Sequence, residues 1–131
     1  MPEYLVNTAT TPPADFSGTA FSHLEVKLLV SGERSDAELT FVGQTVYPAG
    51  GATHEAHYHP NAEETIIVQS GNGRHRVADE WYDLAAGDVL FVPKGAIHTA
   101  VSGDEDLVIY WVLGGAGSLE DAGYVSAEDG G

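Results

Sequence analysis

The sequence predicts a single all-β domain, an antiparallel sandwich or barrel. Short apolar runs recur about every ten residues, and Gly, Pro, Asp or Ser residues separate them. Outside the last eighteen residues no stretch shows an apolar repeat of 3.6 residues, although residues 118–123 suit one turn of helix. A chain of 131 residues has the length of one domain, and many evenly spaced short strands are typical of sandwiches and barrels.

Each predicted strand is an apolar run that ends at residues favouring a turn. In chain order the nine strands cover residues 23–30, 37–47, 56–60, 63–70, 73–78, 81–85, 88–93, 98–102 and 106–113. Residues 1–22, rich in Thr, Ala and Pro, are expected to form an N-terminal arm over a barrel of residues 23–113. Residues 114–131, rich in Gly and acidic residues, are expected to form a C-terminal tail.

Composition excludes several function classes. Twenty acidic and five basic residues give a net charge of −15, which repels nucleic acid and anionic membrane surfaces. The absence of cysteine rules out disulfides, thiolate metal sites and a cysteine nucleophile. The N-terminus has no basic stretch followed by an apolar run, and runs such as residues 107–113 are too short to span a bilayer. A cytoplasmic location is therefore expected.

The stretch HEAHYHPNAEET, residues 54–65, contains three of the six histidines and three acidic residues. His57 and His59 are two residues apart on a predicted strand, so their side chains project from the same face. Of Glu63 and Glu64, only one carboxylate can point inward, because strand side chains alternate. The apolar residues that follow share the face of Glu64, which predicts that Glu64 points inward and Glu63 is exposed. His98, after the turn at residues 93–95, is the best-placed fourth ligand.

These residues resemble the two motifs of the cupin family. The pattern G-x5-HxH-x3,4-E-x6-G is met by Gly51, His57, His59, Glu64 and Gly71. The pattern G-x5-PxG-x2-H-x3-N is met by Gly87, Pro93, Gly95 and His98, with Ser102 in place of the usual asparagine. The chain is thus similar to a small single-domain cupin with an RmlC-like jelly roll. This resemblance implies a double-stranded β-helix barrel and a metal site.

The resemblance implies that His57, His59, Glu64 and His98 bind one divalent transition metal. Nitrogen and oxygen ligands without sulfur suit Fe, Mn, Ni, Zn or Co. Four ligands on an octahedral ion leave two positions for a small-molecule substrate or dioxygen. The same resemblance implies a homodimer with the N-terminal residues packed across its interface.

The expected function is that of a metal-dependent cupin acting on a small oxygen-rich molecule, with a dioxygenase-type oxidoreductase favoured. The alternatives are a non-oxidative isomerase or lyase acting through an enolate, and a non-catalytic module that binds a sugar or acid. The dioxygenase ranks first because the sequence identifies no acid or base near the metal, so catalytic residues stay unassigned. His54 and Glu55 are expected in a solvated loop, and His75 receives no role. Tyr110 and Trp111 point to opposite faces, and the sequence does not say which faces the cavity.

Overall fold

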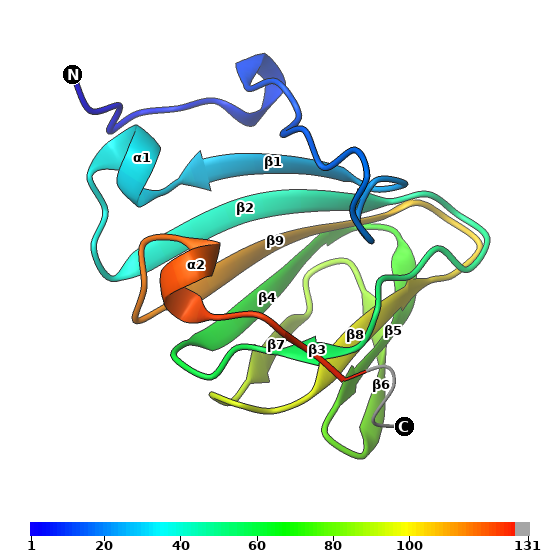
Figure 1. Cartoon of the computed structure of the whole chain (residues 1–131). Helices are drawn as coiled ribbons and strands as arrows, with labels where there is room; N and C mark the ends of the chain where they lie inside the picture. The colour runs from blue at the N-terminus through cyan, green and yellow to red at the C-terminus, as the bar shows by residue number, and fades with distance from the viewer. Residues whose placement is uncertain (128–131) are drawn as a thin grey trace.

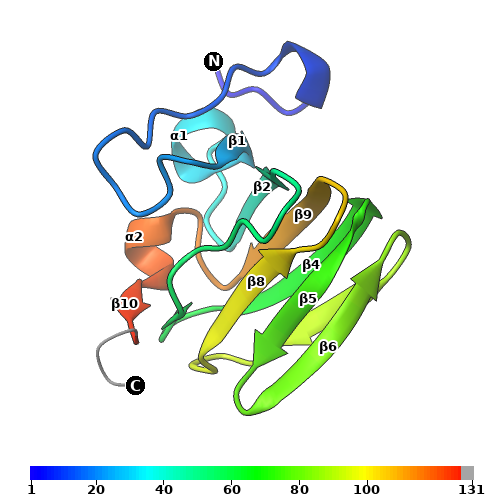
Figure 2. The ribbon, with the colours of Figure 1, turned by 90° about the vertical axis from the view of Figure 1, so that its right-hand side faces the viewer.

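Two five-stranded antiparallel sheets face each other in the computed structural model, which describes residues 1–127 (Figures 1 and 2). The first sheet has the order β1 (Glu25–Val30), β2 (Thr40–Tyr47), β9 (Leu107–Gly114), β4 (Glu63–Ser70) and β7 (Val89–Val92). The second has the order β10 (Val125–Ser126), β3 (His57–Tyr58), β8 (His98–Ser102), β5 (Asn72–Val77) and β6 (Glu80–Ala85). The predicted all-β fold is confirmed. The last four residues of the predicted tail lie outside the described part of the chain.

All nine predicted strands are present, and the differences have local causes. The second strand begins at Thr40 rather than at residue 37. A short helix, α1 (Gly32–Ser35), precedes it, and Ser31 caps this helix by accepting a hydrogen bond from the Arg34 amide at 3.1 Å. The Ala37 amide bonds back to the Ser31 carbonyl at 3.3 Å, so residue 37 belongs to the turn that ends the helix. The predicted helical turn is confirmed as α2 (Leu119–Ala122). Strand β10 was not predicted. It pairs with β3 and forms an edge of the second sheet (Figure 2).

The core lies between the sheets and follows the alternation of each strand. Along β4, Glu64, Ile66 and Val68 are buried, whereas Glu63 and Ile67 are exposed. The inward direction predicted for Glu64 is therefore correct. This alternation places the Glu64 carboxylate on the apolar face of the first sheet, where it points toward the second sheet.

Trp111 faces the cavity and Tyr110 faces outward. The Trp111 indole packs against Gly43 on the neighbouring strand, where any Cβ would overlap its six-membered ring. Its Nε1 donates a hydrogen bond to Thr45 Oγ1 at 2.9 Å, so the ring has a fixed orientation. Trp111 shares the inward face of β9 with the buried Ile109 and Leu113, and the glycine opposite leaves room for its ring.

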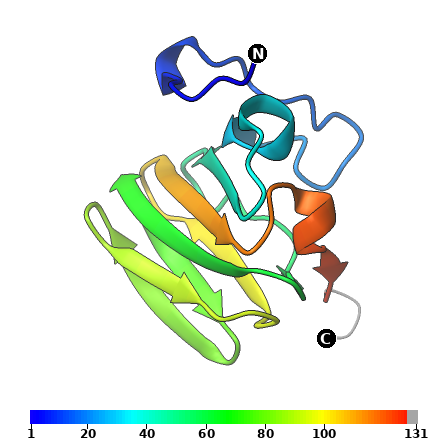
Figure 3. The same ribbon diagram turned by 90° about the vertical axis from the view of Figure 1, so that its left-hand side faces the viewer.

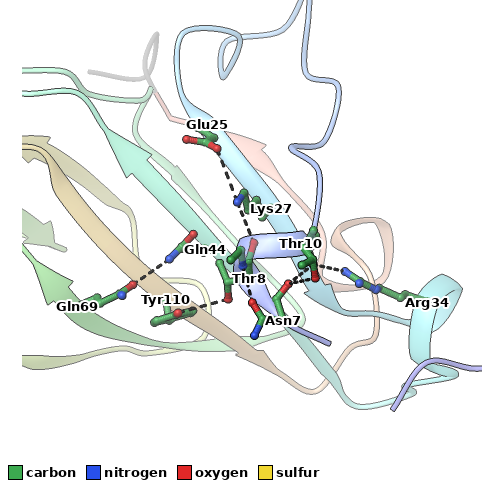
Figure 4. Close-up of polar contacts among 11 residues, drawn as sticks. Asn7, Thr8, Thr10, Glu25, Lys27, Arg34, Gln44, Gln69 and Tyr110 are labelled. Carbon is green, nitrogen blue, oxygen red and sulfur yellow. Dashed lines mark hydrogen bonds and ion pairs between the residues drawn. The ribbon is translucent and has the colours of Figure 1, made fainter. Parts of the chain in front are cut away.

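The N-terminal segment runs beside β1, the edge strand of the first sheet, at the side of the molecule away from β6 (Figures 1 and 3). It includes a short 3-10 helix, η1 (Thr8–Thr10). Lys27 Nζ donates to the Thr8 carbonyl at 2.9 Å, and the Thr8 and Tyr110 hydroxyls lie 3.4 Å apart (Figure 4). Arg34 adds a hydrogen bond to Thr11 Oγ1 at 3.2 Å. These contacts attach the segment to β1 and β9.

Three large apolar side chains are exposed on the outer face of β4 and the edge strand β7: Ile67, Val89 and Phe91. Register places Ile67 opposite Val89, and Phe91 two residues further along the same face. The expected homodimer stays a prediction. Among residues 1–127, no helix has the length and apolar character needed to cross a membrane.

Candidate metal centre

The four predicted ligands converge between the two sheets. His57 lies on β3, His59 directly follows it, and His98 begins β8, where it pairs in register with His57. The candidate ligand atoms of these three histidines all lie within 4.8 Å of one another. Glu64 reaches them from β4 in the opposite sheet, with Oε1 3.1 Å from His98 Nε2 and 3.6 Å from His59 Nε2. All four side chains are buried.

Backbone carbonyls fix how the imidazoles are presented. Nδ1 lies 2.9 Å from the Glu55 carbonyl in His57, 2.7 Å from the Gly123 carbonyl in His59 and 3.1 Å from the Ala96 carbonyl in His98. Because a carbonyl only accepts hydrogen bonds, each Nδ1 must carry the proton. In the neutral ring Nε2 then holds a lone pair, which is the form that binds metals.

Glu64 Oε1 is buried and has no hydrogen-bond partner among the described residues, although two imidazole nitrogens lie close to it. A buried carboxylate oxygen without a donor is costly. A proton on His98 would satisfy only one of the close approaches, whereas a divalent cation would satisfy the carboxylate and all three Nε2 lone pairs. The donor set therefore fits a metal of the kind that prefers nitrogen and oxygen ligands.

Burial is the largest single influence on the pKa of each of the four side chains, but it does not set the direction of the shift in all of them. It lowers the pKa of His57 to about 2, with further lowering from the neighbouring His98 and His54. Burial also lowers the pKa of His59. For His98, burial acts in the same direction, but the adjacent Glu64 carboxylate outweighs it and raises the pKa. For Glu64, burial favours the neutral acid, and the contact with His98 outweighs it and lowers the pKa. Two of the three imidazoles thus accept metal without losing a proton near neutral pH.

Two further histidines lie beside this cluster. His54 was expected in a solvated loop, and this was wrong: it is 6% exposed, its ring centroid is 4.8 Å from that of His57, and it lines the cavity. His75 is 1% exposed and stacks parallel to His98 with centroids 5.9 Å apart. In both, Nδ1 faces a backbone carbonyl, that of Glu55 at 2.8 Å and that of Arg76 at 3.0 Å. Burial lowers the pKa of each to about 4.

The burial of His54 has a packing cause. Its ring stacks on Phe21 at 5.6 Å and lies 5.9 Å from that of Tyr47, so the N-terminal segment covers it. For His75, a signal was present in the sequence. It alternates with Arg74 and Arg76, and placing both arginines outward points the histidine inward.

A cavity of about 340 Å³ opens onto the candidate ligands. This volume lies within the usual range for small-molecule sites. Most of its wall is apolar and aromatic, contributed by Phe16, Phe21, Phe41, Ile66, Trp111 and Tyr124 among others. The histidines and Glu64 form its largest polar cluster, and Ser31, Glu33, Thr45 and Ser118 add further polar side chains to the lining. A ligand in this cavity would meet a mostly apolar surface and could bring its polar atoms to the candidate ligands.

Comparisons with known proteins agree with this architecture. Residues 43–113 match the family model described as Cupin domain. A 65-residue stretch is 43% identical to an oxalate decarboxylase of Arthroderma benhamiae; it covers 44% of this chain and only 15% of that protein. Two solved structures are similar in fold. The polyketide cyclase RemF of Streptomyces resistomycificus has a TM-score of 0.76 and 14% identity, over 95% of this chain and 84% of that one. A Klebsiella pneumoniae protein with a double-stranded β-helix domain has a TM-score of 0.74 and 18% identity, over 96% and 98%.

Proposed function

Because the chain belongs to the cupin family, we propose that it is a metal-dependent enzyme that binds an apolar, aromatic small molecule through its oxygen atoms and moves a proton on it. The observation that carries this proposal is the pair of buried histidines, His54 and His75, in the cavity beside the candidate ligands. The sequence offered no base near the metal and therefore favoured a dioxygenase. His54 and His75 are candidate bases beside the metal centre, so the absence of a base no longer favours a dioxygenase.

The metal would be held by His57, His59, Glu64 and His98. Its donor set suits Fe, Mn, Ni, Zn or Co. When bound, it would act as a Lewis acid on an oxygen of the substrate and make an adjacent C–H or O–H more acidic.

The protein itself would accept the proton. The Nδ1–H groups of His54 and His75 face carbonyls, so each neutral ring keeps its lone pair on Nε2. Each ring is neutral near pH 7 and lines the cavity, so its Nε2 can accept a proton from a bound substrate. The lowered pKa makes each a weak base, so the reaction would depend on the metal to acidify the substrate. Tyr47 is 4% exposed, and burial and then the Glu64 carboxylate raise its pKa, so its hydroxyl keeps its proton.

The cavity walls support an aromatic rather than a small polar substrate. Phe16, Phe21 and Trp111 all line the cavity, and the hydrogen bond to Thr45 fixes the orientation of the Trp111 ring. Such walls gain from contact with an apolar ring and offer few partners to a sugar. The similarity in fold to a polyketide cyclase is consistent with this preference. The similarity to an oxalate decarboxylase supports non-oxidative chemistry but not oxalate as substrate, since it covers 15% of that protein.

A dioxygenase remains the second candidate. It needs no protein base, and an apolar cavity beside a metal with nitrogen and oxygen ligands suits the exclusion of water from reactive oxygen chemistry. Oxygen uptake separates the two candidates.

The test uses 2-hydroxyacetophenone, which combines an aromatic ring, two oxygen donors and an acidic C–H. The protein loaded with Zn²⁺, Mn²⁺ or Fe²⁺ is incubated with it in D₂O, and exchange at the α-carbon is followed by proton NMR beside an oxygen electrode. We expect exchange without oxygen uptake, and a loss of about 100-fold or more in His54→Gln if that ring is the base. Oxygen uptake with the Fe²⁺ protein would favour the dioxygenase. Neither exchange nor uptake with any metal would overturn the proposed reaction.

A further inference from the structure

Gly123 and Tyr124 contact the candidate metal centre, although they lie beyond the residues that match the family model. The carbonyl of Gly123 accepts the hydrogen bond from His59 Nδ1 at 2.7 Å. The ring of Tyr124 stacks on that of His57, with centroids 4.4 Å apart and an angle of 28° between the planes. Two of the candidate ligands are therefore held from outside the motifs that define them.

Glu55 forms a second connection between this segment and the ligands. Its backbone carbonyl accepts hydrogen bonds from Nδ1 of both His57 and His54, at 2.9 and 2.8 Å. Its carboxylate accepts one from the Tyr124 hydroxyl at 2.6 Å and one from Ser126 Oγ at 3.1 Å. The loop residue whose carbonyl sets the tautomer of two histidines is thus bonded through its side chain to Tyr124 and Ser126.

The segment has its own attachments, so it can act as a support. Strand β10 pairs with β3, with Val125 opposite Tyr58 and Ser126 opposite His57. Gly123 has a φ of +80°, and a Cβ there would lie 2.7 Å from Pro60 Cγ. A side chain at position 123 would strain the backbone and displace the turn that follows β3.

We propose that residues 123–126, which we call the C-terminal clasp, are a positioning element of the metal centre and raise its affinity for metal. The clasp fixes His59 through the Gly123 carbonyl. It fixes His57 through the Tyr124 ring and through Glu55. The inference rests on the proposed function only in taking His57 and His59 as ligands. Partners of this kind, which orient metal-binding imidazoles, change metal affinity by about 10- to 100-fold when they are removed.

The test measures binding of Co²⁺ alone, by isothermal titration and by the visible absorption of the bound ion, in protein freed of metal with a chelator. Tyr124→Phe keeps the ring and removes the hydroxyl, and Glu55→Gln keeps the size and removes the charge. We expect each to weaken Co²⁺ binding by about 10-fold and to shift the absorption bands. Because Tyr124 and Glu55 share a hydrogen bond, we expect the double variant to lose less affinity than the sum of the two single losses.

Tyr82→Phe is the matched control, since it removes the hydroxyl of an exposed tyrosine on β6, outside the clasp and outside the cavity lining. It should bind Co²⁺ as the wild type does. Urea unfolding of the metal-free variants separates positioning from stability: Tyr124→Phe should lose affinity and shift the bands even where its unfolding midpoint matches that of the control. Wild-type affinity and bands in both Tyr124→Phe and Glu55→Gln would overturn the clasp. A wild-type protein that binds neither Co²⁺ nor Zn²⁺ would instead overturn the proposed function.

Discussion

Acid should destabilise the metal-free protein through its buried neutral histidines, and His75 gives the sharpest test. It is 1% exposed, on a strand flanked on both sides by β6 and β8, with its ring parallel to that of His98. Burial, and then the nearby His98, lower its pKa to about 4, against 6.5 for an ordinary histidine. The unfolded chain therefore binds more protons than the folded protein between these two pH values.

The sign and size follow from proton linkage. With the folded pKa below the unfolded one, the contribution of His75 is fully present above pH 6.5. It is lost as the pH falls toward 4. At pH 5 the unfolded ring is almost fully protonated and the folded ring almost fully neutral, so the free energy of unfolding drops by about 2 kcal/mol relative to pH 7.5.

The assay is urea unfolding of chelator-treated protein at pH 7.5 and pH 5, for the wild type and for His75→Gln. His75→Gln cannot gain this proton, so its loss of stability between the two pH values should be smaller than that of the wild type by about 2 kcal/mol. Ile66→Val, a buried change without a titratable group, should cost about 1 kcal/mol equally at both pH values. Equal pH-dependent losses in wild type and His75→Gln would refute the reasoning.

Three further outcomes are expected. Metal binding at pH 6 should release about one proton, measured by titration calorimetry in buffers of different ionisation enthalpy. This proton comes from His98, whose pKa is raised because Glu64 outweighs burial, and calorimetry that detects no release would contradict the pairing. Gly43→Ala should lower the free energy of unfolding by about 1 to 3 kcal/mol, because the new methyl group overlaps Trp111; an unchanged urea midpoint would contradict that packing. Light scattering should give twice the mass of one chain, and Phe91→Ser should shift the protein toward monomer; a wild-type monomer at micromolar concentration would count against the homodimer.

The strands and the inward carboxylate were predictable because both depend on local periodicity. Alternation along β4 placed Glu64 and Ile66 inside and Glu63 outside, as the structure shows. The ligands converge because β3 pairs with β8, which places His57 opposite His98. The spacing of the two motifs reflects this pairing. The alternation of side chains along strands and the residue spacings of the two motifs therefore predict most of the arrangement of the ligands.

What the sequence could not give depends on contacts between distant segments. His54 is buried because Phe21, more than thirty residues earlier, stacks on it. The space for the Trp111 ring depends on the absence of a side chain at Gly43. The pairing of β2 with β9 brings these two residues opposite each other, and the sequence alone does not show that pairing. The role of Tyr124 depends on a two-residue strand that is too short to leave a periodic signal.

The five buried histidines share one tautomer, so the tautomer alone does not identify which of them bind the metal. Each directs Nδ1 at a backbone carbonyl, so all five present Nε2 lone pairs when neutral. The metal ligands are instead distinguished from the histidines that face a substrate by where their ligand atoms lie. Among the described residues, the group whose candidate ligand atoms meet within 4.8 Å is His57, His59 and His98, and the unpartnered Glu64 oxygen lies close to the last two. A cation drawn to that carboxylate leaves His54 and His75 free to face a substrate, which is why one tautomer can serve both metal binding and proton transfer.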